Sequence, residues 1–192
     1  MARNFPALGG ADFDMHGMFI GERHDNPEHF NQLLENWPTL SASISVLFLE
    51  HYFAGDSPSG QSVQQIRQYL TARNFLQTAV LPHQIKTLTI LARHSSTEIM
   101  GLDVSRAAAG APVYNPINWR TSQLLQEMWI SAVNQAMLRY PSKPHYAIYG
   151  GGAHGPMLRR YGLRNIICYT RDGEAYREYT AWNLAGGVTW AP

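Results

Sequence analysis

Short apolar runs alternate with amphipathic helical patterns along the chain, and this alternation limits the fold more than any other feature. Runs rich in β-branched and aromatic residues predict strands at residues 17–21, 43–52, 98–103, 145–149 and 164–170. Helical patterns cover residues 26–37, 63–74, 82–94 and 119–140. Strands that alternate with helices favour parallel pairing. We therefore expect an α/β fold with a mostly parallel β-sheet flanked by helices on both faces.

The segments between and after these elements complete the predicted organisation. A Gly/Pro/Ala-rich loop at 106–118 is long enough to suggest a functional role, and a short helical piece at 156–162 leads to the last strand. The tail, with the segments REYTAW and GGVTWAP, predicts a short β-extension at the C-terminus. Because 192 residues suit one folding unit, we expect a single domain over residues 1–192 with its core at about 15–170.

Composition and charge exclude several classes of protein. The chain has 15 Lys and Arg against 14 Asp and Glu, so it lacks the basic excess of a nucleic-acid binder. The hydrophobic content of 45% indicates a folded globular protein. No apolar run approaches the roughly 20 residues of a membrane helix, and the start MARNFPALGGADF lacks the apolar region of a secretory signal. The single cysteine, Cys168, excludes an internal disulfide and a Cys-based zinc site.

Polar side chains follow four of the predicted strands at the point where each strand ends. In open α/β sheets, ligands bind beyond the carboxyl ends of the strands, so we expect these side chains to share one cleft. The side chains are those of Glu22, His24, Glu50, His51, Asp103 and His154, and the glycines Gly150, Gly151 and Gly152 accompany His154. Side chains in such places are expected to add little to the core, so that replacing His24 or His154 changes stability by only about 1 kcal/mol.

The pattern matters because a motif is repeated. A lone histidine after a strand is usually a helix cap or a satisfied polar residue, and glycine runs are common in turns. Here G-x-x-H occurs at Gly21–His24 and again at Gly151–His154, each time after an apolar strand, with a Glu-ended strand between them. This coincidence favours a functional site. The histidines without such company are interpreted as surface, capping or structural residues: His16, His83, His94 and His145.

Two kinds of hydrolytic chemistry suit these groups. In the first, His24 is a general base that takes a proton from water, and Glu22 or Glu50 orients its ring. His154 then acts as an acid or an electrophile, and amides of the glycine run donate to a developing oxyanion. In the second, His24, His154 and a carboxylate hold a divalent metal that activates water.

The reading without a tightly held metal is slightly favoured. Each motif histidine has a carboxylate within or near its motif, whereas a zinc site usually recruits three well-placed ligands. No serine or cysteine lies in a nucleophile-elbow context, and neither G-x-G-x-x-G nor G-x-x-x-x-G-K is present. Covalent acyl-enzyme chemistry and nucleotide chemistry are therefore disfavoured.

The same stretches resemble a known superfamily. FIGERHDNPEHF, LFLEHY, GLD and AIYGGGAHG are similar, in this order, to motifs of the ChaN-like and erythromycin-esterase-like proteins, which are grouped with the Tiki proteases. The superfamily also includes the catalytic lobe of bacterial toxins: the C-terminal region of the Pasteurella multocida toxin and the Ras/Rap1-cleaving endopeptidase domain of Vibrio toxins. The resemblance spans about residues 19–161 and implies an α/β fold with its site at the strand ends.

The resemblance also implies roles for individual residues. The positions that match the toxin endopeptidase motifs are Glu22, His24, Glu50, His51 and His154. The LEH pairing favours the toxin-like branch, and Arg120 matches an arginine that the superfamily places near its site. The supporting residues expected beside this set are Arg120, Asp103, Gly151 and Gly152.

We therefore expect a hydrolase of the peptidase or esterase type, acting on a protein or a small ester, in the setting of a bacterial toxin or effector. Delivery into a target cell as part of a larger protein rests on the analogy with toxins alone. The rival interpretations are a haem-binding ChaN-like module with His29 or His24 near the iron, a metal-dependent Tiki-type protease, and a catalytically dead relative that only binds a partner. The sequence leaves the cofactor and the oligomeric state open.

Overall fold

The strands form one parallel sheet in the order β3-β2-β4-β1-β5. The computed structural model describes residues 17–73, 79–93, 96–105, 107–110, 122–142, 145–155, 158, 163 and 165–168. The strands are β1 (Gly17–Glu22), β2 (Val46–Phe53), β3 (Glu98–Asp103), β4 (Tyr146–Gly151) and β5 (Asn165–Cys168). Because all neighbours run parallel, their carboxyl ends meet at one edge of the sheet.

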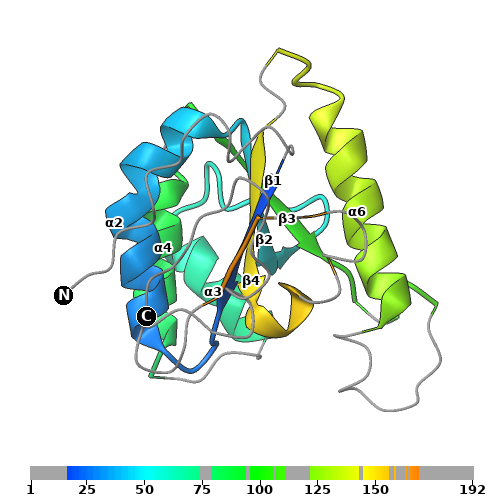
Figure 1. Ribbon diagram of the computed structural model, residues 1–192. Helices are drawn as coiled ribbons and strands as arrows, with labels where there is room; N and C mark the ends of the chain where they lie inside the picture. Colours follow the sequence, from blue (N-terminus) through cyan, green and yellow to red (C-terminus); the bar gives the residue numbers. More distant parts are fainter. Residues whose placement is uncertain are drawn as a thin grey trace.

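Helices cover both faces of this sheet. They are α2 (Pro27–Ser43), α3 (Val63–Arg73), α4 (Leu81–Leu91) and α6 (Gln123–Met137), with a short 3₁₀ turn η1 (Gly152–His154) after β4. Figure 1 shows α2 and α4 packed side by side on one face and α6 on the other. Side chains that alternate along each strand feed two cores: Met18 and Ile20 face α2, α3 and α4, whereas Phe19 faces α6. The predicted α/β fold is confirmed.

Helix α2 begins as the sequence predicts but ends later. The Asn26 side chain accepts a hydrogen bond from the backbone N–H of Glu28 at 3.0 Å, and Pro27 occupies the first turn. The expected end near residue 37 is wrong, because the helix continues through Pro38 to Ser43. Proline lacks one helical hydrogen bond, but Leu40, two residues later, is buried in the core against the sheet and holds the last turn in place.

The remaining boundaries differ from the predictions by a few residues. The predicted C-terminal β-extension, the segment at 156–162 except residue 158, and most of the loop at 106–118 lie outside the described residues. Within that loop, residues 107–110 form a turn. Among the described helices, none is long and apolar enough to span a membrane. The division into a single domain over the whole chain stays a prediction.

Candidate active site

The parallel register brings the two G-x-x-H motifs together. Glu22, at the end of β1, lies directly beside Gly151, at the end of β4, and β2 pairs with the other side of β4. The polar residues at the carboxyl ends of these strands therefore converge, as the strand-end argument predicts, although Glu50 and His51 lie within β2 rather than after it. Glu22, Glu50, His51 and His154 are nearly or fully buried, whereas the His24 side chain is 33% exposed.

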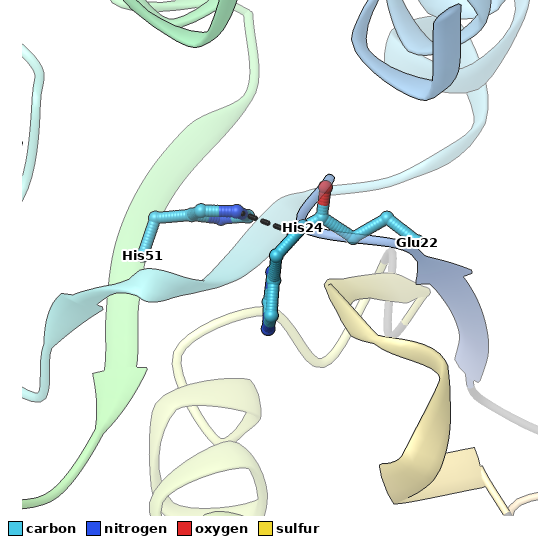
Figure 2. A group of neighbouring side chains, drawn as sticks. All are labelled: Glu22, His24 and His51. Atoms are coloured by element: carbon cyan, nitrogen blue, oxygen red, sulfur yellow. Dashed lines mark hydrogen bonds and ion pairs between the residues drawn. The ribbon is translucent and has the colours of Figure 1, made fainter. Parts of the chain in front are cut away.

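Glu22 is the centre of the first half of this site. Its Oε1 accepts hydrogen bonds from His24 Nδ1 at 2.8 Å and from His51 Nε2 at 2.7 Å. Its Oε2 accepts a longer bond of 3.4 Å from the Tyr149 hydroxyl. Figure 2 shows the Glu22, His24 and His51 side chains meeting where β1 and β2 end. The carboxylate thus fixes the orientation of two imidazole rings.

The surroundings of Glu22 keep it ionised. Burial by itself would raise its pKa, but attraction to His51 and His24 and the hydrogen bonds from both rings outweigh burial and lower the pKa from 4.5 to about 2. Around neutral pH, Glu22 is therefore a buried negative charge. Such a charge holds a proton on His24 Nδ1, which leaves His24 Nε2 as the basic nitrogen of the neutral ring.

His51 supports Glu22 from inside the protein. Its ring is fully buried, stacks on Tyr149 with centroids 5.5 Å apart, and meets the edge of Phe30 at 5.7 Å. A substrate in solution can touch His24, but His51 has no exposed surface. The catalytic role assigned to His51 from its motif stays a prediction, and its geometry is that of a residue acting through Glu22.

Glu50 is the centre of the second half of the site. Its Oε2 accepts a short hydrogen bond of 2.6 Å from the backbone N–H of Gly151, and its Oε1 lies 3.3 Å from His154 Nε2. The same Oε1 lies 3.9 Å from His24 Nε2. Glu50 therefore stands between the two motif histidines, and it connects the two halves of the site.

His154 is held on three sides. Its Nε2 faces Glu50, its Nδ1 lies 2.9 Å from Gln126 Nε2, and the Trp129 ring covers it with centroids 4.3 Å apart. His154 is only 2% exposed, because η1 turns it under α6. The expectation that this side chain adds little to the core is therefore wrong: the strand ends are covered by α6.

The glycine run makes room for these side chains. A Cβ at Gly150 would lie 2.7 Å from Glu50 Oε2, and a Cβ at Gly151 would lie 2.9 Å from His24 Nε2. Both glycines are needed for close approach rather than for a special backbone conformation. The Gly151 amide, expected to donate to an oxyanion, is instead occupied by Glu50. Gly152 begins η1.

Asp103 reaches the site only through an arginine. Its carboxylate pairs with Arg73 Nη2 at 2.5 Å, and the same nitrogen donates to the backbone carbonyl of Glu50 at 3.1 Å. Both side chains are almost fully buried. Asp103 thus holds α3 against the end of β2 rather than pairing with a histidine in the contacts described. Arg120 lies outside the described residues.

The residues fit a divalent metal better than haem. Ligand atoms of Glu22, His24 and His51 lie within 4.8 Å of one another, and two imidazoles with a carboxylate are a common zinc set. This set differs from the expected one, because His154 faces Gln126 and Glu50 instead. The buried His29 accepts a hydrogen bond from the backbone of Arg23 at 2.8 Å, so it is not placed to bind a haem iron.

Sequence reasoning missed two residues of α6, Gln126 and Trp129, and the Arg73 that binds Asp103. A signal for Gln126 was available. It lies beside Leu125 and one turn before Trp129, so it is a polar residue on the apolar face of a helix. A buried amide needs a hydrogen-bond partner, and the partner here is His154. Arg73 and Trp129 gave no comparable signal, because each fits an ordinary helix.

No protein-family model and no curated protein sequence matches the chain. Solved structures match in fold. The type III effector HopBA1 superposes with a TM-score of 0.54 at 16% identity, over 78% of this chain and 75% of its own. RRSP, a MARTX toxin effector domain of Vibrio vulnificus, gives 0.49 at 16% identity over 85% and 35%. Haem-binding ChaN of Campylobacter jejuni gives 0.47 at 12% identity over 80% and 80%.

These matches concern the fold alone, because all identities are low. The chain spans 35% of the length of RRSP and most of the length of HopBA1 and ChaN. The C-terminal region of the Pasteurella multocida toxin is also among the structures matched. The resemblance predicted from the G-x-x-H and LEH motifs is confirmed in that ChaN, RRSP and the Pasteurella multocida toxin region are all among the structures matched. The shared fold itself is shown by HopBA1, with its TM-score of 0.54.

Proposed function

We propose that this protein is a hydrolase in which His24 activates water for attack on a peptide or ester carbonyl. One observation carries the proposal. His24 is the partly exposed member of an otherwise buried polar network, and its Nδ1 donates to the ionised carboxylate of Glu22 at 2.8 Å. A histidine oriented by a buried carboxylate, with its other nitrogen directed away from that carboxylate, is the arrangement of a general base.

Glu50 provides the second hydrogen-bond acceptor for the attacking water. Its Oε1 and His24 Nε2 are two acceptors 3.9 Å apart, a separation at which one water molecule can donate one hydrogen to each. The water oxygen then adds to the carbonyl carbon while its proton moves to His24 Nε2. When the C–N or C–O bond breaks, His24 returns that proton to the leaving nitrogen or oxygen. Water is consumed, and no other reactant is needed.

A divalent metal is the second candidate, because Glu22, His24 and His51 offer a ligand set. When bound, a metal would lower the pKa of a coordinated water. One feature favours the route without metal. His24 Nδ1 and His51 Nε2 both approach the same oxygen of Glu22 at hydrogen-bond distance, so this oxygen already accepts a hydrogen bond from one nitrogen of each ring.

The biological setting is part of the proposal. HopBA1, similar in fold over most of both chains, is a type III effector. We infer that this chain also acts as a toxin or effector on a protein or small ester of a target cell. The site supports this inference only in that its residues suit hydrolysis, and the fold supports it only by analogy with HopBA1.

The test uses the full chain with a random peptide library read by mass spectrometry and a panel of aryl esters. Wild type should release products that His24→Ala does not, and His83→Ala, a histidine outside the site, serves as the matched control. Each protein is assayed before and after dialysis against a strong chelator. Activity that survives chelation supports the metal-free route. Activity that vanishes and returns with Zn²⁺ or Mn²⁺ replaces it with the metal route. Equal product release by wild type and His24→Ala contradicts both.

The setting needs its own experiment. Expression of the chain in yeast should slow growth, and His24→Ala should restore it at equal protein level, because the toxic effect would depend on hydrolysis. His83→Ala should be as toxic as wild type. Toxicity that is unchanged by His24→Ala would show an effect that does not pass through this site.

A further inference from the structure

A buried amide contacts the site from the far side of the sheet. Gln126, on α6, is fully buried beside Leu125, and its Nε2 lies 2.9 Å from His154 Nδ1. Burying an amide among apolar side chains is unfavourable unless it forms hydrogen bonds. The other buried residues of α6 are apolar: Leu125, Trp129, Val133 and Ala136. We therefore look for the role of this amide at its hydrogen-bond partner, His154.

The hydrogen-bonding capacities of the neighbours determine where the proton of His154 lies. As an acceptor, Glu50 Oε1 favours a proton on His154 Nε2, which lies 3.3 Å away. A neutral imidazole has one proton, so Nδ1 is then the acceptor, and Gln126 Nε2 is a donor. The two contacts agree. A second proton on Nδ1 would bring two donors face to face.

We propose that Gln126 is a positioning residue that holds His154 as the neutral ring with its proton on Nε2. Trp129 fixes the plane of the ring, with centroids 4.3 Å apart, and Gln126 fixes which nitrogen carries the proton. His154 then donates to Glu50 without adding a positive charge. Glu50 Oε1 keeps its capacity to accept a hydrogen from the water beside His24.

The contrast with His24 supports this assignment. The ring of His24 is oriented by a carboxylate, which stabilises a positive charge on the ring when it takes up a proton. The ring of His154 is oriented by an amide, which offers no such charge. Two histidines in one site with different partners are suited to different roles, the first to accept a proton and the second to hold Glu50.

The assignment is tested on the protein itself, without any substrate. In the ¹⁵N-labelled full chain, long-range ¹H–¹⁵N correlation spectra distinguish a protonated ring nitrogen from an unprotonated one, and the signals lost in His154→Asn identify His154. Near pH 8, wild type should show Nε2 protonated and Nδ1 unprotonated. A wild-type spectrum with the proton on Nδ1, or with both nitrogens protonated, would overturn the proposal, and a variant is used only to assign the signals.

Two variants sharpen the result. Gln126→Glu replaces the donor by an acceptor, so Nδ1 should become protonated. Gln126→Leu removes one of the two contacts that direct the proton and leaves Glu50, so the tautomer with its proton on Nδ1 should gain population without becoming the sole form. Gln135→Glu adds the same charge at an exposed position of the same helix and should leave the His154 signals unchanged. A Gln126→Glu spectrum identical to that of wild type would contradict the proposal. Should that variant fail to fold, Gln126→Leu carries the same test.

The catalytic consequence rests on the proposed function. In Gln126→Leu, kcat should fall by roughly 10²-fold, the lower end of what a displaced acid–base group costs, with KM nearly unchanged because Gln126 is buried away from the substrate. The spectra are recorded without substrate, so the tautomer of His154 and the proposed hydrolase activity are tested separately. If wild type is inactive but shows the expected tautomer, only the proposed function fails. If Gln126→Leu is fully active although its tautomers have changed, the tautomer does not serve catalysis.

Discussion

The two histidine–carboxylate pairs of the site use the same residue types but are built differently. In the Glu22 half, the pair is close, at 2.8 Å, and the histidine side chain is 33% exposed. In the Glu50 half, the pair is longer, at 3.3 Å, and the histidine side chain is 3% exposed. Residue type alone therefore does not assign a role. Exposure decides which histidine can meet a substrate, and the neighbours decide which proton it carries.

The carboxylates differ in the same way. Glu22 binds two imidazoles through one oxygen. Glu50 uses its two oxygens for different partners, the Gly151 amide and the His154 ring. Both are buried, so each would be costly without these bonds. In the first arrangement one carboxylate oxygen lies beside two imidazole rings. In the second, Glu50 of β2 binds the end of β4 and the turn that follows it.

The largest effects are expected from the histidines themselves. His24→Ala should lower activity by roughly 10²- to 10⁴-fold, because it removes the general base, and should change the free energy of unfolding by no more than about 1 kcal/mol. His154→Ala should also lower activity, but it should cost about 3 kcal/mol of stability, since it leaves a cavity against Trp129. Product release and urea unfolding measure the two effects.

Equal stability of these two variants would show that exposure does not separate the two halves. His83→Ala, outside the site, controls for the loss of any imidazole. A His24→Ala variant that loses its cooperative unfolding transition would make His24 a structural residue. A His154→Ala variant as stable as wild type would mean that α6 closes over the vacated space.

The second prediction concerns acid. The pKa of Glu22 in the folded protein is about 2, below the ordinary value of 4.5. Because the folded pKa is depressed, the stabilisation is fully present above pH 4.5 and is lost as the pH falls toward 2. It amounts to something on the order of 3 kcal/mol. Urea unfolding followed between pH 6 and pH 2.5 should show this decrease.

A matched pair of variants isolates Glu22 from the other carboxylates. Glu22→Gln keeps an acceptor near His24 and His51 but cannot ionise, so it should be less stable at pH 7 and should lose less stability on acidification. Glu35→Gln, on the exposed face of α2, should follow the wild-type curve. A Glu22→Gln curve parallel to that of wild type would show that acid acts elsewhere.

The sequence predicts the edge of the sheet on which the site lies better than it predicts the depth of the site. Apolar runs placed Glu22, His24, Glu50 and His154 at strand ends, and parallel pairing brings such ends together. Burial could not be foreseen, because it depends on how α6 and η1 close over the strand ends. Contacts such as Gln126–His154 join residues 28 positions apart, and no local pattern specifies them.

The same limit explains Asp103. As a strand-end carboxylate it looks like Glu50 in sequence, yet it pairs with Arg73 of α3. An arginine in the last turn of a helix is common and suits the negative end of the helix dipole, so nothing marked Arg73 as a partner. Which strand-end carboxylate meets histidine and which meets arginine is settled by the position of the helices, not by the strands.

The smallest effects are expected at two neighbouring glycines. Replacing the first should lower mainly stability, and replacing the second should lower mainly activity. In Gly150→Ala the new Cβ would lie 2.9 Å from Glu50 Cβ, an atom fixed by the β2 backbone, so the strands must shift at a cost of about 1–3 kcal/mol. In Gly151→Ala the nearest atom is His24 Nε2, at the end of a part-exposed side chain that can move. Stability should barely change there, but activity should fall about tenfold, less than the roughly 10²-fold that a full 1 Å displacement costs. Urea unfolding and product release on both variants make each the control of the other. Loss of stability in Gly151→Ala with activity per folded molecule unchanged would mean that His24 Nε2 need not occupy its observed place, and the water-activating role assigned to it would fail.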